Sequence, residues 1–209
     1  MSIEAVGGGE EVLSTPQTED YEIKPSDKFF SKEFTILEKD WPKAVISTNK
    51  IWHGFNPLDW RAHYKIRDAN TGKLVAEAIK NYGILSFKGL WNLSFLGIFR
   101  SATLSDFDVY DSNGDYIGFI DGKVLDLSKA RFDFQDKEGN IKAYAREEKT
   151  QIYIRDYQTD GIVGYMKRIF DVGTEDSWKF KATNAVDRRV ALIFAAYVVQ
   201  NQSYFLRDL

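Results

Sequence analysis

The chain has 209 residues, a formal net charge of -3 and no cysteine. It is long enough for one sizeable core, and its 44% hydrophobic and 28% charged residues are ordinary for a globular domain. The small negative charge excludes a bulk attraction to nucleic acid or anionic lipid, so any such attraction must be local. Without cysteine there are no disulfides or thiolate metal sites, which suits a reducing compartment. The start of the chain lacks a signal-peptide pattern, so we expect a cytoplasmic protein.

Residues 1–27 are rich in acids and contain Gly7-Gly8-Gly9 and two prolines. Such a segment buries too little apolar surface to offset its ordering entropy. We therefore predict a flexible acidic tail over residues 1–27 and a single folded domain over residues 28–209.

From residue 29 onward, short apolar or alternating segments indicate β-strands. Four connections share a pattern in which an Asp at a strand end is followed three to five residues later by Gly: Asp68 and Gly72, Asp111 and Gly114, Asp136 and Gly139, Asp156 and Gly161. In a hairpin the Asp bonds to amides of its own turn, and the Gly adopts positive φ. The pattern predicts antiparallel hairpins. It does not fit a calcium loop, because Gly114 stands at the fourth loop position instead of the sixth.

Residues 82–99 carry one charge, Lys88, and three glycines that divide them into strand-sized pieces. This favours buried strands with a bend. The alternative is a loop that dips into a membrane interface, which Trp91 and its aromatic neighbours would suit.

Residues 190–199 form the longest unbroken apolar run. At about 1.5 Å per residue, a helix of this length is too short for a bilayer core of roughly 30 Å. A helix that is apolar on every face must be enclosed. We predict a buried helix capped by Thr183 or Asn184, with Asp187 in its first turn. Antiparallel hairpins followed by such a helix predict a mainly β (α+β) protein, a closed antiparallel barrel around the helix, because closure removes exposed strand edges.

The C-terminal part resembles the C-terminal signature of phospholipid scramblases. The resemblance is carried by Gly164-Tyr-Met166-Lys-Arg168-Ile-Phe170, Asp176-Ser-Trp178-Lys-Phe180-Lys-Ala182, Asp187 before the apolar run, and Tyr204-Phe205 after it. Residues 64–77 and 107–120 resemble the first and middle hairpins of that family. The match runs from about residue 30 to the end, and it indicates the superfamily of scramblases, LURP-one-related proteins and tubby C-terminal domains.

This resemblance implies a closed twelve-stranded barrel around a hydrophobic C-terminal helix, with lipid or phosphoinositide contact as the activity most often attributed to it. The chain departs from the scramblase pattern at Thr183 and Ala185, where the family's calcium segment has proline and aspartate. The cysteine cluster used for palmitoylation is also absent. Calcium dependence and lipid anchoring are therefore not carried over.

Basic residues alternate with other residues on two predicted strands. On the first, Arg61, His63, Lys65 and Arg67 would lie on one face over about 20 Å. On the second, Lys179 and Lys181 alternate with aromatic residues. Such rows can hold phosphate groups, and arginine can form paired bonds to them. The predicted lipid- or phosphate-binding residues are Arg61, Lys65, Arg67, Lys179 and Lys181; the alternative is a solvated outer face of barrel strands.

No nucleophile, general base, metal motif or cofactor cradle emerges, and His53 and His63 are the only histidines. We therefore expect a non-enzymatic module without cofactors that binds anionic phospholipid or phosphoinositide headgroups at a membrane surface. We expect no transmembrane span and no nucleic-acid partner. The alternative function is a soluble interaction or scaffold domain that binds a protein partner, and a third is a hydrolase with carboxylates in a groove of the barrel.

Overall fold

The computed structural model describes residues 20–27, 31–49, 63–80, 106–126, 129–148, 151–169, 177–181 and 184–201. The strands are β1 (Asp20–Asp27), β2 (Ser31–Glu38), β3 (Trp41–Asn49), β4 (His63–Asp68), β5 (Leu74–Lys80), β6 (Phe107–Asp111), β7 (Tyr116–Asp126), β8 (Lys129–Asp136), β9 (Ile141–Glu148), β10 (Gln151–Asp156), β11 (Ile162–Ile169) and β12 (Ser177–Lys181), and the helix is α3 (Arg188–Gln200).

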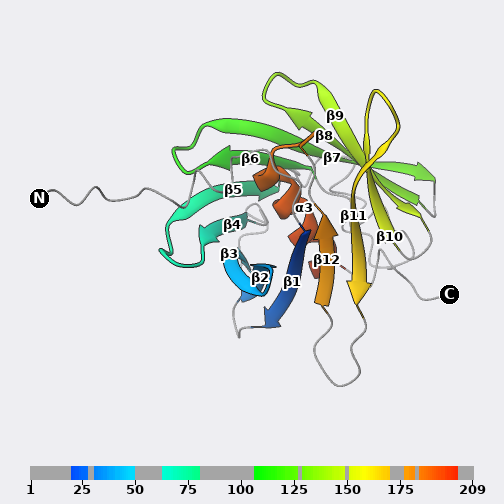
Figure 1. Cartoon of the computed structure of the whole chain (residues 1–209). Helices are drawn as coiled ribbons and strands as arrows, with labels where there is room; N and C mark the ends of the chain where they lie inside the picture. Colours follow the sequence, from blue (N-terminus) through cyan, green and yellow to red (C-terminus); the bar gives the residue numbers. More distant parts are fainter. Residues whose placement is uncertain are drawn as a thin grey trace, which may run out of the picture.

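The twelve strands form one closed antiparallel barrel in which every strand pairs with its sequence neighbours, and β1 pairs with β12. Figure 1 shows the strands arranged around α3. The predicted fold, a mainly β protein with a closed antiparallel barrel of twelve strands and a C-terminal helix, is confirmed. Side chains alternate across the wall: on β12, Trp178 and Phe180 are buried, whereas Lys179 between them is exposed.

The first strand begins inside the predicted acidic tail, so the predicted boundary at residue 27 is wrong. Residues 20–27 form β1, which pairs with both β2 and β12. Tyr21 and Ile23 face the core and are 2% and 0% exposed, whereas Asp20 and Lys24 are exposed. Because only the inward half of a barrel strand must be apolar, an acid-rich segment can still supply a strand.

The helix α3 is enclosed by the barrel, as predicted. Residues 188–199 are all buried, and aromatic rings from the wall contact the helix. The ring centre of Phe194 lies 5.2 Å from that of Phe132 and 5.1 Å from that of Phe134. The ring centres of Tyr197 and Phe107 are 5.1 Å apart. Full burial of such a side chain contributes about 1.5–3 kcal/mol, so this helix is a main source of the core's stability.

The helix cap differs from the predicted one. Asp187 is itself the N-cap, and its Oδ1 accepts a 2.8 Å hydrogen bond from the backbone N–H of Arg189. The prediction of Thr183 or Asn184 as the cap, with Asp187 in the first turn, is wrong. An Asp directly before the first helical residue reaches an otherwise unsatisfied amide of the first turn, which is the role of an N-cap.

The predicted role of the turn aspartates is confirmed. Asp68 Oδ1 accepts hydrogen bonds from the amides of Asn70 and Thr71, and Asp111 Oδ1 accepts them from Asn113 and Asp115. Asp136 and Asp156 bond to their own turns in the same way. The carboxylates of these residues are therefore turn-forming groups.

Positive φ occurs at the predicted glycines in three of the four turns, with φ values of 68° at Gly72, 86° at Gly114 and 84° at Gly139. In the fourth turn the prediction is wrong, because Asp160 adopts positive φ (57°) instead of Gly161. The amide of Asp160 donates to Asp156 O at 3.0 Å, just as the amide of Gly72 donates to Asp68 O at 2.9 Å. Asp160 thus occupies the turn position that Gly72 occupies in the β4–β5 hairpin, and Asp tolerates this conformation better than most residues.

Candidate anion-binding face of the barrel

The predicted basic row on β4 is engaged in local interactions. Lys65 Nζ lies 3.8 Å from Glu77 Oε2 on β5, and Arg67 Nη1 donates a 3.1 Å hydrogen bond to the carbonyl oxygen of Gly72. His63 lies at the start of the strand, and Arg61 is outside the described residues, as is the segment 82–99. The cationic groups of this row that the structure describes therefore already have partners within the β4–β5 hairpin.

The predicted lysines on β12 are in a different situation. Lys179 is exposed and Lys181 half-buried on the outer side of the strand. Within the described parts of the chain, neither makes an ion pair or a side-chain hydrogen bond. Lys167 on β11 lies directly opposite Lys179, and it also lacks such a partner there. Like charges directly opposite on paired strands repel each other, so these three lysines form a cationic cluster without compensation at contact distance.

The two predicted rows do not form one site. Around the barrel, β1, β2 and β3 lie between β12 and β4. At about 4.8 Å per strand spacing, the rows are roughly 19 Å apart along the wall. A small ligand bound by Lys179 and Lys181 would therefore not reach Lys65 or Arg67.

The cationic cluster on β11 and β12 continues instead in the other direction along the sheet. Lys181 lies opposite Tyr165 on β11, Tyr165 opposite Tyr153 on β10, and Tyr153 opposite Arg146 on β9. These residues alternate with buried neighbours, so their side chains are on the outer surface. We call the following set the basic-aromatic face: Arg146, Tyr153, Tyr165, Lys167, Lys179 and Lys181.

Arg146 is one of four residues of this face that sequence reasoning missed; the others are Tyr153, Tyr165 and Lys167. Arg146 makes no ion pair or hydrogen bond with any residue of the described ranges, and its Nε is buried without a hydrogen-bond partner. In the sequence it stands in the run Arg146-Glu147-Glu148-Lys149, which resembles an ordinary solvated charge run. Only the pairing of β9 with β8 and β10 shows that the described acids near it are engaged by other cations.

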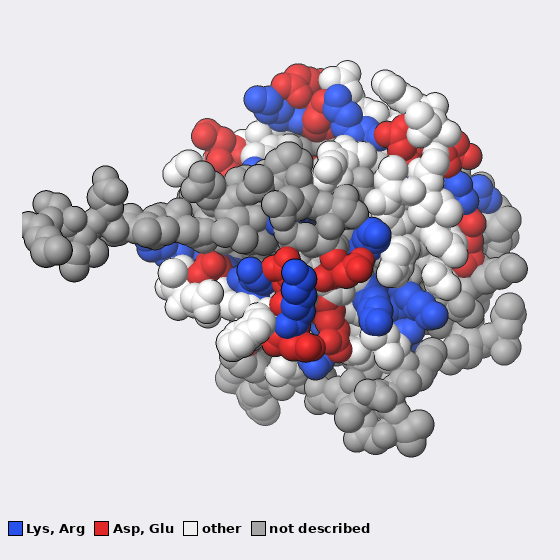
Figure 2. All heavy atoms as spheres, in the orientation of Figure 1, with Lys and Arg blue, Asp and Glu red and all other residues white. Residues whose placement is uncertain are grey.

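Acidic residues border the face on β1. Glu22 lies opposite Lys179 and Asp20 opposite Lys181, and Glu22 pairs with Lys24 on its own strand at 3.5 Å. Figure 2 shows the same arrangement, with basic side chains gathered where β11 and β12 lie and a group of mixed sign over β1. The positive surface is therefore local, as the net charge of the chain requires.

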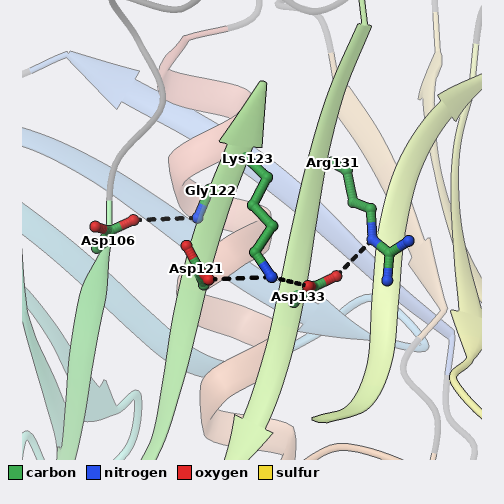
Figure 3. Close-up of polar contacts among 6 residues, drawn as sticks. All are labelled: Asp106, Asp121, Gly122, Lys123, Arg131 and Asp133. Atoms are coloured by element: carbon green, nitrogen blue, oxygen red, sulfur yellow. Dashed lines mark hydrogen bonds and ion pairs between the residues drawn. The ribbon is translucent and has the colours of Figure 1, made fainter. Parts of the chain in front are cut away.

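A second polar group lies next to the face on β7 and β8 (Figure 3). Asp133 is only 1% exposed although it lies on the outer side of the wall, and it contacts Lys123 Nζ at 2.5 Å and Arg131 Nε at 2.6 Å. Lys123 also lies 3.3 Å from Asp121, and Asp106 accepts a 3.2 Å hydrogen bond from the amide of Gly122. The hydrogen bond that Lys123 donates to Asp133 is the main cause of the raised pKa of Lys123. Charge-assisted bonds of this kind fix the side chains that make them.

Arg131 is held on both sides. Its guanidinium lies 4.1 Å from the ring centre of Tyr144 and 5.9 Å from that of Tyr157, and the hydroxyl of Tyr144 donates to Asp160. Its two terminal nitrogens make no hydrogen bond with the described residues. The contacts therefore orient a guanidinium whose terminal donors have no partner among the described residues, on the residue whose backbone lies opposite Arg146.

Acids with altered pKa give no support to a carboxylate-dependent hydrolase. A hydrogen bond from Lys142 lowers the pKa of Asp136 to about 2, and the Thr159 amide lowers that of Asp156. Burial would raise the pKa of Asp68, but hydrogen bonds from Thr71 and Asn70 and the charge of Lys43 together lower it. A general acid at neutral pH needs a raised pKa, and all three of these aspartates have the opposite shift.

No protein-family model, curated protein or solved structure matches this chain. The class that the structure defines is a closed twelve-stranded antiparallel barrel with a C-terminal helix buried inside it. Among the residues that the structure describes, no helix has both the length and the apolar character needed to cross a bilayer. The same residues contain no group of three or more His, Cys, Asp or Glu that could hold a metal ion.

Proposed function

We propose that the protein binds anionic phospholipid headgroups at a membrane surface through the basic-aromatic face, as a non-enzymatic member of the scramblase and tubby-like superfamily. The observation that carries this proposal is the set of four cations, Arg146, Lys167, Lys179 and Lys181, that have no acidic partner within the described part of the chain. By contrast, Lys65 on the opposite wall is already paired.

The arrangement of the face suits a flat anionic surface. Tyr153 and Tyr165 lie at its centre, with Arg146 on one side and Lys181 on the other. The face is three strand spacings wide, or about 14 Å. Tyrosine is favoured at membrane–water interfaces, where its ring and hydroxyl meet apolar and polar surroundings. The central rings would contact the interfacial region while the flanking cations reach headgroup phosphates.

The magnitude of the attraction follows from the number of cations. Each Lys or Arg near an anionic membrane contributes about 1 kcal/mol, so four contribute roughly 4 kcal/mol before salt screening. At physiological ionic strength the Debye length is about 8 Å. Binding should therefore be reversible, weakened by salt and dependent on the fraction of anionic lipid.

The test is co-sedimentation of the purified protein with phosphatidylcholine vesicles that contain graded amounts of phosphatidylserine, at low and physiological salt. Lys179→Gln/Lys181→Gln removes two cations and should weaken binding by about 2 kcal/mol, or roughly 30-fold. Lys65→Gln/Arg67→Gln is the matched control, because it removes the same charge from the opposite wall. Absence of wild-type binding at low salt would overturn the proposal and favour the protein-interaction alternative.

A further inference from the structure

Arg131 and Arg146 lie directly opposite each other on the outer surfaces of β8 and β9. The Cβ atoms of such a pair are about 4.5–5.5 Å apart, and like charges in this position destabilise the sheet. Figure 3 shows the guanidinium of Arg131 projecting from β8 over the neighbouring strand. An anion that both guanidinium groups contact would convert this repulsion into attraction.

Both arginines have unused donors. Arg131 bonds to Asp133 through Nε alone, and its terminal nitrogens make no hydrogen bond with the described residues. Arg146 makes none at all with them, and its Nε is buried. A buried donor without a partner costs about 1–3 kcal/mol. Because this Nε is buried, an anion would be contacted by the terminal nitrogens of Arg146, as it would be by those of Arg131.

The nearby carboxylates are already engaged. Asp133 forms ion pairs with both Lys123 and Arg131. Glu148, two residues after Arg146 on β9, pairs with Arg155, whose Nη2 lies 3.1 Å from Glu148 Oε1. Among the residues that the structure describes, no carboxylate therefore accepts a hydrogen bond from Arg146.

We propose that Arg131 and Arg146 clamp a phosphate monoester, an inference that rests on the proposed function and names the headgroup chemistry that the basic-aromatic face prefers. A monoester carries a charge of about -1.5 to -2 at pH 7 and three terminal oxygens. Two guanidinium groups can donate to it at the same time, each through a pair of N–H groups. A headgroup carboxylate or phosphodiester has one negative charge and two such oxygens, so it satisfies fewer donors.

The experiment compares phosphatidic acid, whose headgroup is a phosphate monoester, with phosphatidylserine in vesicles of equal surface charge. Wild-type protein should bind the phosphatidic acid vesicles about tenfold more tightly, as expected for one added charge-assisted interaction. In Arg146→Gln this preference should disappear, while binding to phosphatidylserine falls at most about fivefold through the loss of one cation. Arg67→Gln, which removes one arginine from β4, should keep the preference.

Soluble glycerol 3-phosphate distinguishes the source of the monoester. Displacement of the wild-type protein from phosphatidic acid vesicles by this competitor would show that the clamp takes the phosphate group itself. An Arg146-dependent preference that resists competition would support the clamp with the membrane-embedded headgroup as its ligand. Arg146→Gln should unfold at or above the wild-type temperature, because it removes the repulsion between Arg131 and Arg146 and a buried donor without a partner among the described residues.

Failure of the clamp and failure of membrane binding give different results. Equal binding of the two lipids by the wild-type protein would overturn the clamp and leave the proposed function intact. If neither vesicle is bound, the proposed function fails, and calorimetric titration with glycerol 3-phosphate tests the clamp alone. Binding that is lost in Arg146→Gln would then support the clamp, and absence of wild-type binding would overturn it.

Discussion

Gly164 on β11 packs directly against the backbone of Lys181 on β12. A Cβ atom at position 164 would lie 2.6 Å from the carbonyl oxygen of Lys181 and 3.4 Å from Ile154 Cδ1. The first contact is with backbone, which cannot rotate away as a side chain can. The seam between β11 and β12 therefore depends on glycine, and this seam positions the three lysines of the basic-aromatic face.

Gly164→Ala should destabilise the protein by about 1–3 kcal/mol, the usual cost of inserting volume into a packed site. Urea unfolding measures this change. Gly161→Ala is the control, because its new Cβ would meet only a side-chain oxygen, that of Thr159, at 3.3 Å. Equal stability of the two variants would contradict the tight packing of the seam.

The β2–β3 connection contains two consecutive residues of positive φ, Lys39 at 49° and Asp40 at 68°. Two such residues define a type I′ turn, for which Asn-Gly is the preferred pair. Lys39→Asn/Asp40→Gly should therefore raise the free energy of unfolding by about 1 kcal/mol. Thermal unfolding measures this gain in stability. A midpoint temperature that is lowered or unchanged in the variant would contradict the type I′ turn.

Lys80 at the end of β5 should make stability rise with pH in the alkaline range. Burial lowers its pKa from 10.5 to about 8, partly offset by the charge of Asp106. The unfolded chain then binds more protons than the folded chain between pH 8 and 10.5, so the cost of burying this amine is fully present below pH 8 and vanishes above about pH 10.5. A shift of this size corresponds to roughly 3 kcal/mol.

Lys80→Met should consequently be more stable than the wild-type protein at pH 7, and its advantage should decrease as pH approaches 10.5. Chemical denaturation at a series of pH values measures both curves. An advantage that stays constant with pH would show that it comes from packing and not from the buried charge.

Asp136 should contribute to acid sensitivity. Its pKa is about 2, chiefly because Lys142 bonds to it, and Asn140 contributes as well. A carboxylate with a lowered folded-state pKa stabilises the fold above about pH 4, and this contribution is lost as pH falls towards 2. Asp136→Asn should therefore be less stable than the wild-type protein at pH 7 and should differ less from it at pH 2. A difference in stability between the two proteins that is the same at pH 7 and at pH 2 would contradict the lowered pKa of Asp136.

The fold was predictable because its signals are local. The Asp and Gly residues of the hairpins and the apolar run before Gln200 are each readable from a few neighbouring residues. The start of β1 was missed because the acid content of the segment outweighed the alternation of Tyr21 and Ile23, although a barrel strand needs only that alternation. Asp160 was missed because its Gly neighbour suggested the wrong turn residue.

The site was predictable only in part. Lys179 and Lys181 could be identified from alternation on one strand, but alternation does not show which cations have acidic partners. That information depends on strand pairing, which gives Lys65 its contact with Glu77 and leaves Arg146 beside Arg131. The register within these hairpins, which is shifted by an irregularity next to each turn and is not specified by sequence patterns, therefore decides which basic residues are available to a ligand.

The most direct test of membrane binding through the basic-aromatic face uses the absence of cysteine from the chain, which allows single labels to be placed without background. An environment-sensitive fluorophore is attached to Tyr165→Cys at the centre of the face, or to Ser47→Cys, which lies opposite Lys65 on the other wall. On addition of phosphatidylserine vesicles at low salt, we predict a blue-shifted, brighter emission from position 165 and little change from position 47, with the shift reversed by salt. A larger shift at position 47 than at position 165 would contradict the account, because the membrane would then contact the wall on which the basic residues are already paired.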